Sequence, residues 1–148
     1  MVQAQKKEGP QAIGRSRGGL TTKIHVLTDT FGNLVHFKLT GGNEHDSPHA
    51  KALLSSINAE RVIPDKAYDS NELLTTIDQM GAGAVIPSKA NRKQQRTLDV
   101  ETYKRRNRIE RFFSLLKQFR RIATRYEKLA SRYAAFVLVV AGFVWREC

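Results

Sequence analysis

The feature that most constrains the fold is the alternation of strand-like and helix-like segments along the chain. Two segments rich in β-branched, aliphatic and aromatic residues, 22–28 and 34–40, flank a turn-forming stretch at residues 29–33. This pattern predicts an antiparallel hairpin. The segments that follow come in the order helix, strand, helix, strand, helix, helix. Such an order predicts an α/β fold, with a partly parallel sheet covered by helices.

Capping residues set the expected boundaries of these elements. Asp46 or Ser47 is expected to cap a helix, a short strand at 61–64 delivers Asp65, and Ser70 caps a second helix that Gly81 ends. The other expected elements are a strand at 84–86, a basic loop at 88–97, a long amphipathic helix at 99–119 and an apolar helix at 133–146.

Length and composition fit one domain in a reducing, cytoplasmic setting. Residues 1–20 are expected to form a flexible basic lead-in to a single domain over residues 21–148. Cys148 is the single cysteine, so a disulfide or a cysteine zinc site within the chain is excluded. No signal peptide is expected, and the longest apolar run is well short of the roughly 20 residues that span a bilayer. No membrane partner is therefore expected.

The positive charge is concentrated in one region. The formal net charge is +11, and residues 88–128 hold 14 Lys and Arg against 4 Asp and Glu, a net of +10. An excess of this kind predicts a polyanionic partner, and nucleic acid is the commonest one in the cytosol. The alternative is a solvated basic face that serves solubility, although such faces usually mix charges of both signs.

The expected helix at 99–119 has three faces on a helical wheel. The apolar face is Ile109, Phe112, Phe113, Leu116 and Phe119. A polar stripe is formed by Tyr103, Arg106, Glu110, Ser114 and Lys117. The third face is basic, with Lys104, Arg108 and Arg111. Taken alone, the polar stripe is best explained by an ion pair of Arg106 with Glu110, worth about a few tenths of a kcal/mol.

Glu110 and Asp65 are nevertheless candidates for metal-dependent chemistry on phosphodiesters. Glu110 is a lone carboxylate among cations, which would hold phosphates while the carboxylate holds a metal ion. Asp65 comes at the end of an expected strand, where open sheets place their ligands. Asp69 is more simply explained as a cap of the helix at Ser70 or as a brace of the turn.

These residues carry a resemblance to insertion-sequence transposases of the DDE type. The Y-x2-R-x3-E-x6-K signature of that group is matched by Tyr103, Arg106, Glu110 and Lys117. Residues 65–70 resemble its D-K-G-Y-D-S segment, with Ala67 where glycine is usual, and residues 14–19 and 42–46 resemble segments of the family-five insertion sequences. Each motif alone is weak, but the spaced four-residue signature after residues 65–70 is specific.

The resemblance implies a ribonuclease H-like mixed sheet flanked by helices. It also implies that two Asp and one Glu bind two divalent ions, Mg²⁺ or Mn²⁺, with Asp65 as the second Asp and Glu110 as the Glu. The ions would activate water to cut a DNA strand and then the freed 3′-hydroxyl to join it to a target. The implied partners are double-stranded DNA, at the element ends and the target, and further copies of the protein. The expected DNA contacts are Tyr103, Arg106, Lys117, Arg105, Arg108 and Arg111.

One departure concerns the first Asp of the family, which lies on a strand before the segment matched by residues 14–19. No acidic residue precedes Glu8, and Asp29 falls in the expected hairpin turn. The isolated chain is therefore expected to lack the first strand and the first Asp, and to be inactive. It would be the downstream product of two overlapping frames, with the upstream product as its fusion partner, or a truncated copy.

Other interpretations stay open at this point. The alternative function is a non-catalytic DNA-binding protein or regulator derived from a transposase, and a third is a hydrolytic nuclease of the same fold. His45, Asp46 and His49 could ligate a metal, although capping by Asp46 is the simpler explanation. His25 and His36 are expected to face each other across the hairpin as surface or sheet residues. Further cations that could hold DNA, or solvate a helix end, are Arg120, Arg121 and Arg125.

Overall fold

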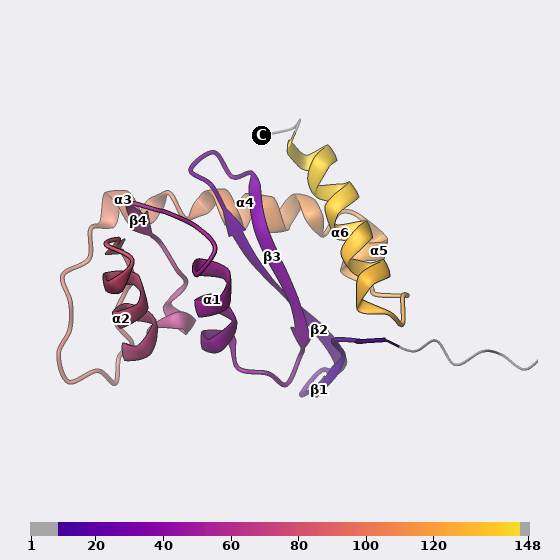
Figure 1. Cartoon of the computed structure of the whole chain (residues 1–148), viewed down its shortest axis with the longest axis horizontal. Helices are drawn as coiled ribbons and strands as arrows, with labels where there is room; N and C mark the ends of the chain where they lie inside the picture. Colours follow the sequence, from indigo (N-terminus) through magenta and orange to yellow (C-terminus); the bar gives the residue numbers. More distant parts are fainter. Residues whose placement is uncertain (1–8, 146–148) are drawn as a thin grey trace, which may run out of the picture.

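A three-stranded antiparallel sheet lies between two layers of helices in the computed structural model, which describes residues 9–145 (Figure 1). The sheet consists of β1 (Gly14–Ser16), β2 (Gly19–Thr28) and β3 (Leu34–Gly41). One face is covered by α1 (Asp46–Leu54), which is backed by α2 (Asn71–Gln79). The other face is covered by α4 (Asn107–Leu116) and α6 (Ala130–Trp145).

The predicted hairpin is confirmed, since β2 and β3 pair in antiparallel register along nearly their whole shared length. The Asp29 carboxylate closes the turn by accepting the backbone N–H of Phe31 at 2.8 Å and that of Asn33 at 2.9 Å. Gly32 has a φ of +93°, which side chains rarely tolerate, and the turn packs beside Arg108 of α4. The hairpin tip is thus held against the helix that carries Glu110.

Successive side chains of β2 point alternately into two hydrophobic cores, one on each face of the sheet. Ile24 and Val26 pack against the cluster formed by α4 and α6, whereas Leu27 packs against the cluster formed with α1 and α2. His25 points to the same side as Leu27, where it contacts Tyr68. The period of two along a strand therefore gives one sheet two buried faces.

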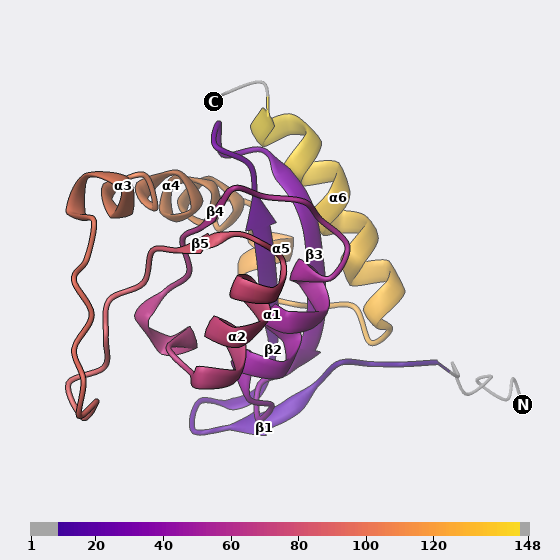
Figure 2. The ribbon, with the colours of Figure 1, turned by 60° about the vertical axis from the view of Figure 1, so that its left-hand side comes forward.

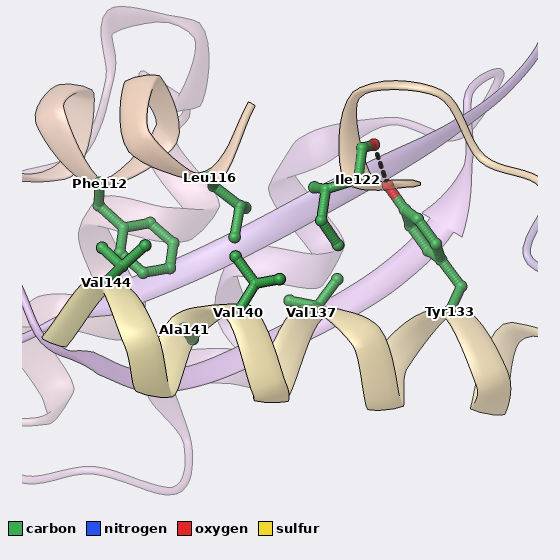
Figure 3. Packing of buried hydrophobic residues seen from close by; sticks show 8 residues of the cluster. All are labelled: Phe112, Leu116, Ile122, Tyr133, Val137, Val140, Ala141 and Val144. Atoms are coloured by element: carbon green, nitrogen blue, oxygen red, sulfur yellow. Dashed lines mark hydrogen bonds between the residues drawn. The ribbon is translucent and has the colours of Figure 1, made fainter. Parts of the chain in front are cut away.

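The larger core lies between α4, α6 and the sheet (Figure 3). Its buried members are Phe112, Leu116, Ile122, Tyr133, Val137, Val140, Ala141 and Val144. Tyr133 keeps its polar end satisfied by donating its hydroxyl hydrogen to the Ile122 carbonyl at 2.7 Å. Each fully buried Phe or Leu in such a core contributes about 1.5–3 kcal/mol. The apolar face predicted for the helix at 99–119 is therefore confirmed for Phe112 and Leu116.

The α/β class is confirmed, but residues 9–145 form two sheets rather than one mixed sheet. The second is a parallel pair of β4 (Arg61–Val62) and β5 (Gly83–Ala84). Each of these strands is only two residues long, and Pro64 has no N–H with which to extend the ladder. β4 and β5 therefore pair with each other, and within residues 9–145 neither strand is hydrogen-bonded to the sheet that contains β2.

The expected flexible lead-in at residues 1–20 is wrong for its second half. Residues 14–20 form β1 and the start of β2, and the two strands pair. Before them, the carbonyls of Gln11 and Ala12 accept hydrogen bonds from the Arg125 guanidinium at 2.5 and 3.1 Å. The first eight residues lie outside the described part of the chain.

The single long helix expected at 99–119 is divided into two shorter helices, and a third short helix follows it. These are α3 (Val100–Lys104), α4 and α5 (Arg120–Ala123). Between α3 and α4 the N–H groups of Arg105 and Arg106 donate to carbonyls three residues back, which is the tighter 3₁₀ pattern. Phe119 is extended and separates α4 from α5. α3 and α4 still lie end to end (Figure 1). The predicted apolar face holds for Phe112, Phe113 and Leu116 but not for Phe119, which is exposed.

Candidate active site

Asp65 lies three residues after β4, so the strand expected at 61–64 is confirmed for Arg61 and Val62 only, and an irregular segment separates it from Asp65. It is the N-cap of a 3₁₀ helix, η1 (Lys66–Tyr68), and its Oδ1 accepts the backbone N–H of Ala67 at 3.1 Å. The side chain remains 47% exposed. The turn therefore fixes the carboxylate in place and leaves Oδ2 free for another partner.

Glu110 lies in the first turn of α4, and its backbone N–H donates to the Arg106 carbonyl at 3.4 Å. Its side chain is 57% exposed. Asp65 and Glu110 therefore belong to different parts of the fold, and both can be reached from solvent.

Arg106 joins these two carboxylates. Its Nη2 lies 2.6 Å from Asp65 Oδ2 and its Nη1 lies 2.6 Å from Glu110 Oε1. The predicted ion pair between Arg106 and Glu110 is thus confirmed, but it is half of a larger arrangement. The guanidinium is rigid and planar, so it sets the relative position of the two carboxylates. Tyr103 lies beside it, with the ring centroid 5.9 Å from the guanidinium carbon, within cation–π range.

Glu110 also lines an open groove of about 1190 Å³. Ser114 and Lys117 line the groove from α4 and its C-terminal end, and Thr21 and Ile24 line it from β2. This arrangement confirms that Glu110, Ser114 and Lys117 share one side of the helix. The Lys117 ammonium group, two turns from Glu110 along this groove, can pair with an anionic group of an extended ligand.

A row of three exposed arginines follows α3 and α4, and we call Arg105, Arg108 and Arg111 the arginine row. All three side chains belong to exposed residues. None of them takes part in an ion pair among the described residues. Their charge is therefore available to a partner, in contrast to that of Arg106.

Asp69 is the residue that the sequence interpretation assigned least well. It does not cap α2, because the Ser70 hydroxyl accepts the Leu73 N–H itself. The Asp69 side chain is fully buried, and it accepts hydrogen bonds from Arg92 and Arg96 and from the Lys89 backbone, each at 2.7 Å. Burial by itself would raise the pKa of the Asp69 carboxyl group, but these hydrogen bonds outweigh it and hold the pKa well below its usual range.

One signal in the sequence could have pointed to this role of Asp69. Residues 88–96 carry four cations and no acidic residue, so an ordered loop there needs an acidic partner from elsewhere. Asp69 is a candidate for that partner, because Ser70 already supplies the cap of the helix that follows.

Two of the histidines, His25 and His49, lie together on the other face of β2. His25 is buried, not on the surface, and is hydrogen-bonded to Tyr68 at 3.2 Å and Thr40 at 2.9 Å. Its ring centroid lies 5.1 Å from that of His49, which pairs with Glu44. Burial lowers the pKa of His25 and raises the pKa of Tyr68 to about 12. His25 is opposite Lys38 in the sheet, so the expected pairing with His36 is wrong.

The alternative metal interpretation at residues 45–49 gains no support. The N-cap of α1 is His45 and not Asp46 or Ser47. The His45 side chain makes no capping hydrogen bond. Asp46 instead forms an ion pair with Lys23 at 2.9 Å. Within residues 9–145, no three His, Cys, Asp or Glu side chains gather as a metal-ligand set.

Arg125 serves the fold. Besides the carbonyls of residues 11 and 12, its guanidinium binds the Thr22 hydroxyl and the carbonyls of Glu127 and Lys128, and it lies 5.1 Å from the Tyr133 ring centroid. Arg120 and Arg121 are exposed, with Arg121 over the Phe136 ring. The expectation that all three hold DNA or solvate a helix end is thus wrong for Arg125.

Asp65 and Glu110 form a donor set that suits a hard divalent cation. Both present carboxylate oxygens, both are exposed, and each has an oxygen that Arg106 does not contact. Magnesium is commonly held by one or two carboxylates together with water and phosphate oxygens. The pair therefore fits such an ion, although the described residues bring only two carboxylates together.

Comparison with known proteins identifies relatives of the chain. A family model described as the transposase DDE domain matches residues 2–144. A protein of Brucella ovis, described as a candidate transposase for insertion sequence element IS6501, is 38% identical over 128 residues, which cover 85% of this chain and 98% of the relative. A Burkholderia cepacia protein described in the same way for element IS402 is 29% identical over 143 residues, covering 88% of this chain and 64% of the relative.

No solved structure shows a significant match to the chain. Among the described residues, no helix combines the length and the apolar character needed to cross a membrane.

Proposed function

The chain belongs to the DDE transposase family, and we propose that Asp65 and Glu110 are two of the carboxylates that carry out its DNA cleavage and strand transfer. The observation that carries this proposal is the bridge through Arg106, which holds Asp65 and Glu110 from separate elements 2.6 Å from one guanidinium. Three residues of the spaced signature, Tyr103, Arg106 and Glu110, thus meet at the second Asp of the family pattern.

The family depends on divalent metal ions, and we propose magnesium here, held by Asp65 and Glu110. When bound, such an ion would lower the pKa of an attacking water or hydroxyl group and stabilise charge on the phosphate oxygens. The all-oxygen donor set supports magnesium over a softer metal. Two ions are expected in the complete enzyme, by family resemblance.

The remaining residues would bind and orient DNA. Lys117 would contact a phosphate along the groove that begins at Glu110. The arginine row would contact phosphates on the adjacent exposed side. Arg106 would exchange a carboxylate for a phosphate oxygen when DNA arrives, and Tyr103 would keep its guanidinium plane in place. The proposed partner is double-stranded DNA, at element ends and at a target, which would place the protein at the bacterial nucleoid.

We further propose that the fold is ribonuclease H-like and that the third carboxylate comes from a strand before Gly14. The three-layer arrangement and the order of the strands support the fold. Residues 9–145 bring two carboxylates together, and the family pattern needs a third. An upstream reading frame fused to this chain, within an oligomeric complex of several copies, would supply it.

The test is cleavage of element-end DNA with magnesium, using the chain and its fusion to the upstream reading frame. Asp65→Asn and Glu110→Gln should abolish cleavage in the active form and leave end binding in place, because each removes a ligand charge and keeps the shape. Glu101→Gln is the matched control, since Glu101 is an exposed carboxylate that pairs only with Lys104 on α3. Near-wild-type cleavage by Asp65→Asn or Glu110→Gln would exclude that residue from the site.

A second candidate function is a non-catalytic regulator that occupies the element ends. The meeting of only two carboxylates within the described residues favours it for the chain alone. End binding without cleavage by both the chain and the fusion would support the regulator. Magnesium-dependent cleavage that Glu110→Gln removes would support the enzyme.

A further inference from the structure

Residues 88–96 form an ordered loop, which we call the basic strap. It contains no helix or strand, and it runs out from β5 and returns to α3 (Figure 2). Its two ends are tied by the hydrogen bond from the Arg96 backbone N–H to the Ser88 hydroxyl at 3.0 Å. Inside it, the Gln95 side-chain amide donates to the carbonyls of Lys89 and Arg92. The loop is thus held in one conformation without secondary structure.

Asp69 is the anchor of this strap. Its two carboxylate oxygens are both used: Oδ2 accepts from Arg92 Nε and the Lys89 N–H, and Oδ1 accepts from Arg96 Nη2. Arg92 also donates to the Asn71 side chain at 2.6 Å. A carboxylate as deeply buried as this one is tolerated only when its hydrogen-bonding capacity is filled. Lys89, Arg92 and Arg96 of the strap are therefore all hydrogen-bonded to the Asp69 carboxylate.

The anchor leaves a defined set of cations free. Arg92 and Arg96 are spent on Asp69, whereas the ammonium groups of Lys89 and Lys93 take part in no ion pair within residues 9–145. The strap therefore presents two lysines held by an internal frame of two arginines. A loop whose only task was to connect β5 with α3 would need neither lysine.

The strap is also tied to the candidate active site. The 3₁₀ helix η1 has Asp65 as its N-cap and Asp69 as its C-cap. The backbone N–H of Tyr68 donates to the Asp65 carbonyl at 2.9 Å, and that of Asp69 donates to the Lys66 carbonyl at 3.1 Å. One rigid turn thus carries the site carboxylate at one end and the strap anchor at the other.

We propose that Asp69 is a positioning residue that fixes the basic strap, so that Lys89 and Lys93 contact DNA phosphates at a set place relative to Asp65. This inference rests on the proposed function, because it takes DNA as the partner. Simple charge counting gives the opposite expectation for Asp69: its removal makes the chain more positive and should strengthen binding to DNA.

The test compares salt dependence of binding to duplex DNA, measured by fluorescence anisotropy on the full chain. Replacing Lys89 and Lys93 by Gln should lower the slope of log affinity against log salt by about 1.8 if each lysine neutralises one phosphate. In the Asp69→Asn background the same double change should lower the slope by less than half as much. The control is Lys38→Gln with Lys51→Gln, which removes the same charge elsewhere and should not be sensitive to Asp69.

The outcomes separate the two levels of the argument. Equal effects of the Lys89 and Lys93 changes in both backgrounds, or no effect in the wild-type background, would overturn the inference about Asp69 and the strap. Absence of salt-dependent DNA binding by the wild-type chain would overturn the proposed DNA-binding function itself.

Footprinting of the wild-type chain keeps the inference testable if Asp69→Asn does not fold. Lysine acetylation, mapped by mass spectrometry, should decrease at Lys89 and Lys93 when duplex DNA is added and stay constant at Lys38. Acetylation of Lys89 and Lys93 that DNA does not change would overturn the proposed contact.

Discussion

The arginine row offers the sharpest test of where DNA lies on this protein. Arg105, Arg108 and Arg111 are exposed along α3 and α4 and have no ion-pair partner in the described part of the chain. If each neutralises one phosphate, replacing all three by Gln should lower the salt slope of log affinity by about 2.7. As a result, the affinity ratio of wild type to variant should shrink about 40-fold between about 50 and about 200 mM salt.

The assay is a titration of labelled duplex DNA at four or more salt concentrations, with circular dichroism to verify folding. The matched control replaces Arg15, Lys38 and Lys51 by Gln, which removes the same charge from exposed positions outside residues 88–128. A slope that falls equally in both triple variants would show that total charge governs binding. A slope that the arginine-row variant leaves unchanged would place the DNA on another surface, and the argument from free arginines would be refuted.

Further predictions concern the fold that holds the site. Arg125→Gln should lower the free energy of unfolding by about 2 kcal/mol, which corresponds to a fall in melting temperature of about 4–8 °C. The reason is that several backbone carbonyls and the Thr22 hydroxyl lose a charged hydrogen-bond donor. Arg120→Gln, which removes an exposed arginine, is the control in the same thermal melt. Gly32→Ala should lower the free energy of unfolding in urea by about 1–2 kcal/mol, because the φ of Gly32 is +93°. Gly142→Ala, in an open position on α6, should raise it by up to about 1 kcal/mol. Similar shifts for both variants would contradict the role of the turn. The lowered pKa of His25 means that the unfolded chain binds this proton more readily, so its contribution to stability should be complete above about pH 6.5 and decrease below it. Urea unfolding between pH 7.5 and 5.5 should therefore show a pH dependence that His25→Gln flattens and His36→Gln retains.

The helical segment that carries Tyr103, Arg106 and Glu110 could be predicted from sequence because its information is local. The spacing of Tyr103, Arg106 and Glu110 places them on one side of a helix whatever the rest of the chain does, and the break between α3 and α4 shifts that side little. The strand before Asp65 also followed from short-range pattern, although it ends at Val62 and not at Pro64. The contact of Arg106 with Asp65 joins residues 41 positions apart, and no periodicity encodes it.

The misplaced residues show where such reasoning fails. The hairpin register places His25 opposite Lys38 and Leu27 opposite His36, with a register shift only between Leu27 and Thr28. Turn geometry and the buried faces set this register, and the composition of the two strands does not. Side chains on β2 then divide between two cores, which requires knowledge of both helical layers. Asp69 reaches the strap through side-chain hydrogen bonds across 20 to 27 residues. Its neighbours in sequence resemble a capping segment, and that local resemblance hid the longer-range role.

The concentration of positive charge in residues 88–128 overstates what a DNA backbone can use. Arg92 and Arg96 neutralise Asp69, Arg106 is shared by Asp65 and Glu110, and Arg125 is occupied by backbone carbonyls and a hydroxyl. An arginine in such contacts exchanges one anion for another when it meets a phosphate, so it adds less to affinity than a free cation does. Apart from Arg125, the cations of this region that take part in no ion pair within residues 9–145 are the arginine row, Lys89 and Lys93 of the basic strap, Lys117, Arg120 and Lys128. If Asp65 and Glu110 form the proposed metal site, affinity and chemistry are divided between different residues, and Arg106 joins the two. A phosphate that takes its guanidinium would then release an oxygen on each of the two carboxylates.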